Sequence, residues 1–291
     1  MLKIPNFKLQ LFAFITIALT AMPAAAVPNA NPPVQRIVAI GGAVTEILYA
    51  LGQDRKIVGV DTTSLYPPQA LKSKPNVGYF RAFSPEGVLS LDPTLIIASD
   101  AAGPAYAIKL LQQSKIPVER LSDDFTAAGV VAKIETIGHL THSESKAAEL
   151  AKSISQGFAD VAALRRRADG KTRVLFIIAM QGGRPLVAGN GTAADAMIKL
   201  AGGVNVGADF VGYKQMNDES IIAGAPDVIV MMANGKQPDK NEIFGLPALK
   251  TVPAASHQRL VAMDGLYLLG FGPRTPQAAK DLLGAFYPGL K

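Results

Sequence analysis

Short apolar runs alternate with segments of helical spacing along the first half of the chain. Residues 36–40 form a mostly apolar run that leads into the pair Gly41-Gly42, and residues 44–51 then carry apolar side chains at helical spacing. Further strands are predicted at 57–60 and 95–98, and further helices at 84–91 and 106–114. Strands that are apolar on both faces and alternate with helices indicate a parallel sheet covered on both sides.

A long helical stretch follows, and the alternation of strands and helices then returns. Helical spacing runs over 127–140 and again over 143–167, and the second helix would be roughly 37 Å long. Beyond it, strands are predicted at 173–178, 227–231 and 260–263, and helices at 192–201 and 275–287. We therefore predict an α/β protein of two Rossmann-like lobes with central parallel sheets, 34–142 and 172–291, joined by one backbone helix over 143–168. A ligand would lie between the lobes, beyond the carboxyl ends of the strands.

The first 26 residues have the pattern of a secretory signal peptide. Lys3 and Lys8 give a basic start, residues 11–21 are apolar, and Ala24-Ala25-Ala26 offers a small-residue cleavage site. The apolar run is too short for a comfortable membrane span, although an uncleaved anchor is the alternative. The chain contains no cysteine, so it has neither disulfides nor a lipid-anchored Cys, and the periplasm is the expected location.

Charge and motifs exclude several classes of function. The net charge of +6 falls to +4 without Lys3 and Lys8, which is too mild and dispersed to indicate nucleic-acid binding. His139 and His142 are three residues apart, but no carboxylate pattern completes a metal site with them. No G-x-S-x-G elbow or paired acid motif is present, so we do not expect an enzyme.

The turn 76–81 carries the strongest candidate chemistry. It places the Tyr79 phenol two residues before the Arg81 guanidinium, just ahead of the predicted helix at 84–91 and so near the ligand-facing edge of the sheet. A phenol has an unperturbed pKa near 10 and is a poor ligand, but ferric iron displaces its proton and a neighbouring Arg stabilises the phenolate. Our hypothesis is that Tyr79 is the axial ligand of a haem iron; the alternative is a packing tyrosine.

The pair Gly41-Gly42 and the residue Glu46, both close to the first predicted strand, can be explained by their local structure alone. Gly41-Gly42 lacks the rest of a nucleotide-binding motif, so close backbone approach at the cleft is the better interpretation. Glu46 lies near the start of an otherwise apolar helix, where a carboxylate complements the helix dipole.

Several motifs together resemble the periplasmic haem-binding proteins of ABC-type haem importers, which belong to the helical-backbone class (class III) of periplasmic binding proteins. They are R-I-V-A-I-G-G-A-V-T-E-I-L-Y-A-L-G, V-G-Y-F-R and S-P-E-G-V-L-S-L-D-P-T-L-I-I-A in the first half. Similarity continues through P-L-V-A-G-N-G-T-A-A-D-A-M-I-K-L-A-G-G and E-S-I-I-A-G-A-P-D-V-I-V to G-P-R-T. The G-Y-x-R turn is the feature peculiar to the haem branch, whereas the later motifs mark the class.

The resemblance implies a set of roles for individual residues and partners. Tyr79 would be the axial ligand of ferric haem (ferric protoporphyrin IX), carried as transported ligand, and Arg81 would hydrogen-bond to its oxygen. Glu46 and Glu219 would face arginines of an ABC permease dimer in the inner membrane. An outer-membrane haem receptor would act upstream of what we expect to be a monomeric carrier. Some relatives supply a histidine from the second lobe, but the loop 179–184 has none, which leaves a second haem in doubt.

Apolar and aromatic side chains would cover the faces of the porphyrin. The candidates are Phe80, Met180, Tyr213, Tyr267 and Phe271, each of which has an alternative role in packing. Arg274 is a candidate partner for a haem propionate, with a surface ion pair as the alternative. The rival hypotheses are the same fold with a ferric siderophore or cobalamin, a secreted enzyme, and a structural or adhesion protein.

Overall fold

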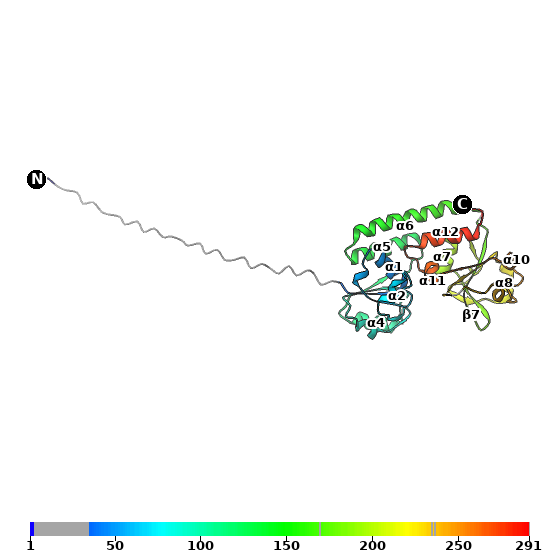
Figure 1. Ribbon diagram of the computed structural model, residues 1–291, viewed down its shortest axis with the longest axis horizontal. Helices are drawn as coiled ribbons and strands as arrows, with labels where there is room; N and C mark the ends of the chain where they lie inside the picture. The colour runs from blue at the N-terminus through cyan, green and yellow to red at the C-terminus, as the bar shows by residue number, and fades with distance from the viewer. Residues whose placement is uncertain (3–34, 169, 234, 236, 291) are drawn as a thin grey trace. The chain divides into compact units, whose positions relative to one another are not determined.

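Two sheets organise the described part of the chain, one before and one after a long helix (Figure 1). The structure is a computed structural model that describes residues 1–2 and 35–290, apart from 169, 234 and 236. The signal peptide predicted over 1–26 lies outside the described residues except for Met1 and Leu2. The residues described from Gln35 onward belong to one compact unit.

The first sheet is parallel throughout. Its strands, in the order β2-β1-β5-β6, are β1 (Ile37–Ile40), β2 (Ile57–Val60), β5 (Leu95–Ser99) and β6 (Val118–Leu121). Successive residues of a strand point to opposite faces, so Ile37 and Ala39 pack with α1 (Gly42–Ala50) and α5 (Ala127–Leu140). Val38 and Ile40 pack on the other side with α3 (Pro85–Leu89) and α4 (Ala105–Gln113).

Shorter elements complete the first lobe. They are η1 (Asp54–Lys56), α2 (Gln69–Ser73) and the hairpin of β3 (Gly78–Tyr79) with β4 (Ala82–Phe83).

The second sheet mixes parallel and antiparallel strands. Its strands are β7 (Arg173–Gln181), β8 (Arg184–Ala188), β9 (Val204–Asn205), β10 (Tyr213–Gln215), β11 (Val228–Met232) and β12 (Leu260–Met263). Strands β7, β11 and β12 are parallel, as predicted. The short strand β9, which was not predicted, also pairs parallel to β7, whereas β8 and β10 run antiparallel to their neighbours. The difference arises at Gly182-Gly183, where positive φ values of 59° and 78° let the chain turn directly back along β7.

Helices cover both faces of the second sheet as well. On one side, alternate residues such as Val174 and Phe176 pack with α7 (Ala193–Leu200), α11 (Gly265–Leu269) and α12 (Thr275–Phe286). On the other, Leu175 and Ile177 pack with α8 (Asp218–Gly224), α9 (Lys240–Phe244) and α10 (Pro253–Ser256).

The helix predicted over 143–168 is observed as α6 (Glu144–Arg165), which packs against α5, α7 and α12 (Figure 1). Its buried residues recur every three to four positions and are Ala147, Ala151, Ile154, Phe158 and Val161. These side chains belong to one hydrophobic cluster that contains both Ile37 of the first sheet and Val174 of the second. The two lobes therefore share a core along α6, and the predicted α/β class with sheets joined by a backbone helix is confirmed.

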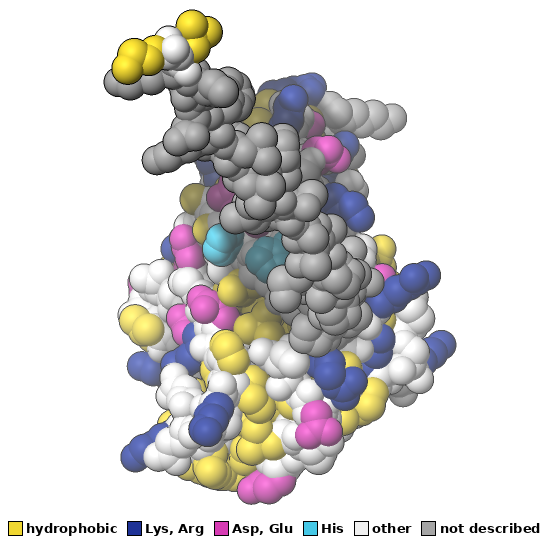
Figure 2. Space-filling view, turned by 90° about the vertical axis from the view of Figure 1, so that its left-hand side faces the viewer, with side chains coloured by type: hydrophobic (Ala, Val, Ile, Leu, Met, Phe, Trp, Pro, Cys, Tyr) yellow, Lys and Arg dark blue, Asp and Glu magenta, His cyan; other side chains and the backbone are white. Residues whose placement is uncertain are grey.

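The described part of the surface carries charges of both signs. Among the described residues, no helix is both long and apolar enough to cross a membrane. On the face that Figure 2 shows, Lys and Arg are interspersed with Asp and Glu, and neither sign forms one broad patch among the side chains that are coloured.

Candidate functional site

A cavity of about 640 Å³ lies between the carboxyl ends of the two sheets. In the first lobe its wall includes Gly41 after β1, Thr63 after β2, Ser99 at the end of β5, and Asp123 after β6. In the second lobe it includes residues of β7, β8, β10 and β11 and the corner formed by α11. Its volume is typical of sites for small molecules and cofactors, and its position is the one that the parallel sheets predict.

Tyr79 lines this cavity from the β3–β4 hairpin. Gly78 has φ +104°, and a Cβ atom there would lie 3.2 Å from the Cα of Phe83, so the turn requires glycine. The Gly78 carbonyl accepts a hydrogen bond from the Thr62 amide at 2.9 Å, which fixes the hairpin to the end of β2. The Tyr79 side chain is 45% exposed, and no described residue hydrogen-bonds to its hydroxyl. The phenol is therefore held beside the cavity with its oxygen available to a ligand.

The two residues after Tyr79 also line the cavity. The Phe80 ring packs edge-on against the Tyr79 ring, with 4.8 Å between their centroids, and the Arg81 guanidinium carbon lies 5.0 Å from the Phe80 centroid. Within the described part of the chain, Arg81 has no ion-pair partner. An uncompensated cation beside an available phenol is the combination that stabilises a phenolate.

Tyr213 supplies a second phenol from the opposite lobe, on β10. Burial raises the pKa of Tyr213, while the nearby Thr192 hydroxyl and the Arg81 guanidinium lower it by less. The charge of Arg81 thus acts on a residue of the second lobe across the cavity. Of the aromatic residues predicted to form the walls, the structure brings Phe80 and Tyr213 together here with Tyr79.

Three other predicted wall residues do not line the cavity. Met180 lies near the tip of the β7–β8 hairpin opposite Pro185 and is 37% exposed. The Tyr267 hydroxyl donates to Asp281 Oδ2 at 2.8 Å, and burial together with this carboxylate raises the pKa of the phenol. Phe271 is buried in the core, with its ring centroid 5.1 Å from that of Phe125.

Apolar residues within strands, at their ends and in the segments after them form much of the wall instead. They are Val44, Leu65, Leu121, Ile178, Leu186, Met232, Leu266 and Leu269. Leu121 and Met232 end their strands, whereas Ile178 and Leu186 lie within β7 and β8.

Glu46 and Arg274 form a partly buried ion pair. Glu46 Oε2 lies 2.9 Å from Arg274 Nη2, and the Arg274 amide donates to Glu46 Oε1 at 3.0 Å. The Arg274 guanidinium carbon also lies 3.6 Å from the centroid of the Tyr66 ring. Glu46 is only 4% exposed, so the structure does not present it on a surface where a permease could dock, and Arg274 is engaged outside the cavity wall.

Glu219 is exposed in the first turn of α8, and Glu86 is its counterpart in the first lobe. Each lies two residues after the helix N-cap, which is Asn217 or Ser84, and each lies nine residues before the strand that follows, β11 or β5. Glu86 is also exposed. The shared order of cap, glutamate and strand was visible in the sequence, although our sequence analysis did not pair Glu86 with Glu219.

Two carboxylates, the buried Asp61 and the partly exposed Asp123, fix the first-lobe edge of the cavity. Asp61 is fully buried and accepts hydrogen bonds from the Gly41 amide at 2.8 Å and the Thr63 amide at 2.8 Å. Asp123 accepts from the Ser99 hydroxyl at 2.8 Å and the Ala101 amide at 2.8 Å. These bonds tie the loops after neighbouring strands together, and they leave the backbone at Gly41 close to the cavity.

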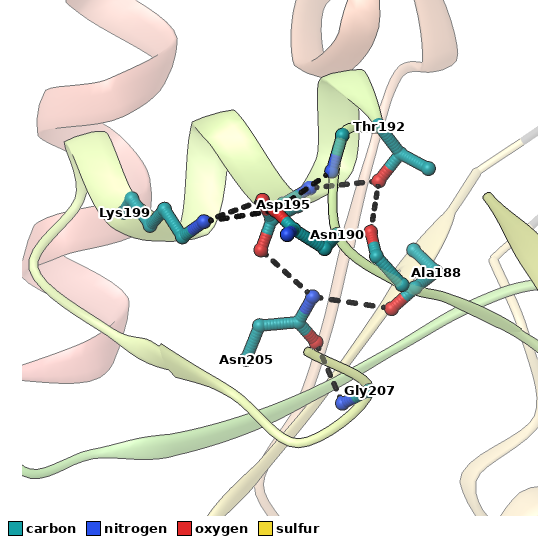
Figure 3. A network of polar contacts seen from close by, with 9 residues as sticks. Ala188, Asn190, Thr192, Asp195, Lys199, Asn205 and Gly207 are labelled. Carbon is teal, nitrogen blue, oxygen red and sulfur yellow. Dashed lines mark hydrogen bonds and ion pairs between the residues drawn. The ribbon is translucent and has the colours of Figure 1, made fainter. Parts of the chain in front are cut away.

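A matching network holds the second-lobe edge (Figure 3). Asp195, which is 3% exposed, pairs with Lys199 at 2.7 Å and accepts from Asn205 Nδ2 at 3.0 Å. Asn205 Nδ2 also donates to the Ala188 carbonyl at 3.2 Å, and the Thr192 hydroxyl donates to the Gly189 carbonyl at 2.8 Å. This fixes the turn between β8 and α7, beside the cavity residues Ala193 and Tyr213.

The described residues contain no group of three or more His, Cys, Asp or Glu side chains that could hold a metal ion. Of the two histidines that lie three residues apart, His139 places its Nδ1 atom 3.6 Å from Glu144 Oε1. A metal that reaches the cavity already held by a macrocycle would need only one or two protein ligands, such as a phenol.

The family of the chain follows from comparison with known proteins. The family model described as "Periplasmic binding protein" matches residues 37–266. The chain belongs to this family. This periplasmic binding protein is 30% identical over 257 residues to the uncharacterized ABC transporter substrate-binding lipoprotein YvrC of Bacillus subtilis, covering 87% of the chain and 80% of the relative.

Relatives with a stated ligand fall into two groups. The chain is 27% identical over 230 residues to the vitamin B12-binding protein of Vibrio parahaemolyticus, with 76% of the chain and 80% of the relative covered. The structure is similar to that of the periplasmic heme-binding protein RhuT from Roseiflexus sp. RS-1 in its apo form, with a TM-score of 0.83 and 37% identity. That match covers 87% of this chain and 98% of the other. This periplasmic binding protein is thus a substrate-binding protein of an ABC-type importer, and its family indicates an extracytoplasmic location.

Proposed function

We propose that this protein binds ferric haem in the cavity between its lobes, with the Tyr79 phenolate as axial ligand to the iron, and delivers it to an ABC permease. The observation that carries the proposal is the position of Tyr79. Tyr79 borders the cavity, its hydroxyl has no hydrogen-bond partner among the described residues, and it lies in the same hairpin as Arg81, which has no ion-pair partner among them. Similarity to the heme-binding protein RhuT supports the same ligand.

The shape and polarity of the wall suit a porphyrin. Aliphatic side chains from both lobes, together with Phe80, offer apolar contact to the faces of a flat macrocycle. Arg81 would move from the Phe80 ring to the phenolate oxygen when iron displaces the phenol proton, because a charge-assisted hydrogen bond is stronger than a cation–π contact at a partly exposed site.

The second candidate is cobalamin bound in the same cavity, which the vitamin B12-binding relative favours. Cobalamin brings an iron-free macrocycle with its own axial base, so its binding would not depend on one phenol in the way that haem binding does. The two candidates therefore differ in what removal of the Tyr79 hydroxyl should do.

Absorption titrations decide between them. Hemin and cyanocobalamin are added in turn to the wild type, to Tyr79→Phe and to Tyr213→Phe, which serves as the matched control because its phenol lines the same cavity. We expect the wild type and Tyr213→Phe to give a tyrosinate-haem spectrum that Tyr79→Phe lacks. Binding of cyanocobalamin in preference to hemin would overturn the proposed ligand, and an unchanged hemin spectrum in Tyr79→Phe would overturn the role of Tyr79.

We further propose that the permease dimer recognises the carrier through Glu219 and Glu86, one carboxylate from each lobe. Both are exposed, and both occupy the same position relative to a capped helix and the strand after it. Glu86 takes the role that our sequence analysis gave to Glu46, because the Glu46 carboxylate is occupied by Arg274. Fixed, exposed charges on the two lobes suit recognition by basic residues of a two-fold partner.

The carrier would act as a monomer in the periplasm after removal of residues 1–26, downstream of an outer-membrane haem receptor. Residues of both lobes share one hydrophobic cluster along α6, and separation of the lobes would disturb it. The lobes would therefore not separate spontaneously, and release of the ligand would require the permease.

A further inference from the structure

Lys133 is a buried cation on the wall of the cavity, at a position that neither the family nor the proposed iron ligand explains. It belongs to α5, its side chain is 6% exposed, and it borders the cavity beside Asp123 and Phe125. Within the described part of the chain its ammonium forms no hydrogen bond and has no carboxylate oxygen within 4.0 Å.

The ammonium of Lys133 is not sealed within the packing, although Lys133 is almost fully buried. Among described residues, the fully enclosed side-chain nitrogen without a hydrogen-bond partner is Arg274 Nε, and Lys133 Nζ is not enclosed in this way. Because the residue as a whole is almost fully buried and lines the cavity, the cavity is where its nitrogen retains access. Its three hydrogen-bond donors are thus available to a ligand and to water there.

The nearest acidic groups do not neutralise this cation. Asp123 and Asp124 act on Lys133 through space, but burial has the larger effect and the pKa of the ammonium is lowered overall. The Asp123 carboxylate already accepts hydrogen bonds from the Ser99 hydroxyl and the Ala101 amide. A buried charge without a hydrogen-bonded partner is unfavourable. The Lys133 ammonium is such a charge, and it belongs to a residue on the wall of the cavity.

We propose that Lys133 binds a carboxylate group of the ligand within the cavity. The inference rests on the proposed function, under which the carboxylate is one of the two propionates of haem. A short hydrogen bond between ammonium and carboxylate in a water-poor site is strong and selective for an anionic substituent. One propionate would then point inward to α5, and the cavity would distinguish porphyrins that bear free carboxylates from those that do not.

Esterification of the propionates tests this assignment. Hemin and hemin dimethyl ester are titrated against the wild type, Lys133→Met, and Lys109→Met, a control with an exposed lysine on α4. We expect the wild type and Lys109→Met to prefer hemin over the ester by about tenfold or more, and Lys133→Met to lose that preference through weaker hemin binding alone. The tyrosinate-haem spectrum should persist in Lys133→Met, since Tyr79 is unchanged.

The possible outcomes separate this inference from the proposed function. If hemin binds but Lys133→Met keeps the wild-type preference over the ester, Lys133 does not receive a propionate, while the function stands. If neither porphyrin binds the wild type, both the function and this role of Lys133 are wrong.

A measurement on the ligand-free protein distinguishes a ligand-binding lysine from a structural one. Methionine has similar length and no charge, so Lys133→Met should melt at or above the temperature of the wild type if the ammonium has no partner in the folded protein. A melting temperature several degrees lower than that of Lys109→Met would assign Lys133 to a structural interaction with Asp123 and Asp124, and would overturn the proposal.

Discussion

Glu46 and Arg274 lie 228 residues apart in the sequence, and two hydrogen bonds join them. The pair links α1 of the first lobe to the N-terminus of α12 in the second. Nearby, a Cβ atom on Gly42 would lie 2.5 Å from Leu266 Cδ1, so the lobes approach each other closely at this point. The contact therefore ties the two lobes together beside the floor of the cavity, where Gly42 and Leu266 form part of the wall.

Removal of the Glu46 carboxylate should destabilise the protein. Glu46→Ala leaves the Arg274 guanidinium without its anionic partner, and we expect the free energy of unfolding to fall by about 2–4 kcal/mol. The loss should stay below that of a fully enclosed pair because the Arg274 side chain is 27% exposed. Urea unfolding measures the change, with Glu149→Ala on the exposed face of α6 as control. Equal stability of the two variants would show that the ion pair contributes little.

The exposed glutamates should matter for transport and not for ligand binding. Glu86→Ala and Glu219→Ala each remove one charge from a lobe without touching the cavity, so we expect haem affinity and melting temperature to stay unchanged. Stimulation of the permease ATPase in vesicles should fall in each single variant and further in the double variant. Glu149→Ala provides the matched control, and full stimulation by the double variant would exclude these residues from docking.

Arg81 should increase the affinity for hemin without being required for ligation of the iron by Tyr79. In Arg81→Ala the phenolate of Tyr79 loses a neighbouring cation, and we expect about tenfold weaker hemin binding with a spectrum still typical of tyrosinate ligation. Arg55→Ala, at an exposed position in η1, is the control. Loss of the tyrosinate spectrum in Arg81→Ala would show that the phenolate cannot form without the guanidinium.

The sequence predicts the sheets well because apolar periodicity is a local property. Residues 37–40 and 95–99 form parallel strands as expected, and α6 spans nearly the predicted range. The antiparallel β8 was missed because Gly182-Gly183 was interpreted as part of a loop, although a glycine pair between two apolar runs also favours a hairpin.

Residue roles that depend on distant partners were not predictable in the same way. The partner of Glu46 comes from the far end of the chain, so the local pattern indicated only a helix-dipole role. Phe271 lies between two glycines, has φ +48° and packs in the core rather than on the cavity wall, a tertiary outcome that its local sequence does not indicate. Lys133 had a usable signal, because it interrupts the apolar stripe formed by Val130, Ile134 and Ile137.

Lys133 should make the free energy of unfolding of the ligand-free protein change with pH in the alkaline range. Burial lowers the pKa of Lys133 below its ordinary value of 10.5, so between the two pKa values the unfolded chain binds more protons than the folded protein does. Below the lowered pKa the cost of the buried ammonium is fully present. As the pH rises from there toward 10.5 the folded protein sheds this proton, and the contribution of Lys133 to stability becomes less unfavourable.

The measurable consequence is a comparison of melting temperatures across pH. Any excess in the melting temperature of Lys133→Met over the wild type should be largest near neutral pH, and should shrink as the pH approaches 10.5. Lys109→Met should track the wild type throughout, because the Lys109 side chain is exposed on α4 and its replacement leaves the buried ammonium of Lys133 in place. An excess that grows with alkaline pH would mean that folding raises the pKa of Lys133, as a close ion pair with Asp123 or Asp124 would do. The sign of the change in this melting-temperature difference with pH therefore shows whether the Lys133 ammonium lacks an ion-pair partner in the ligand-free protein.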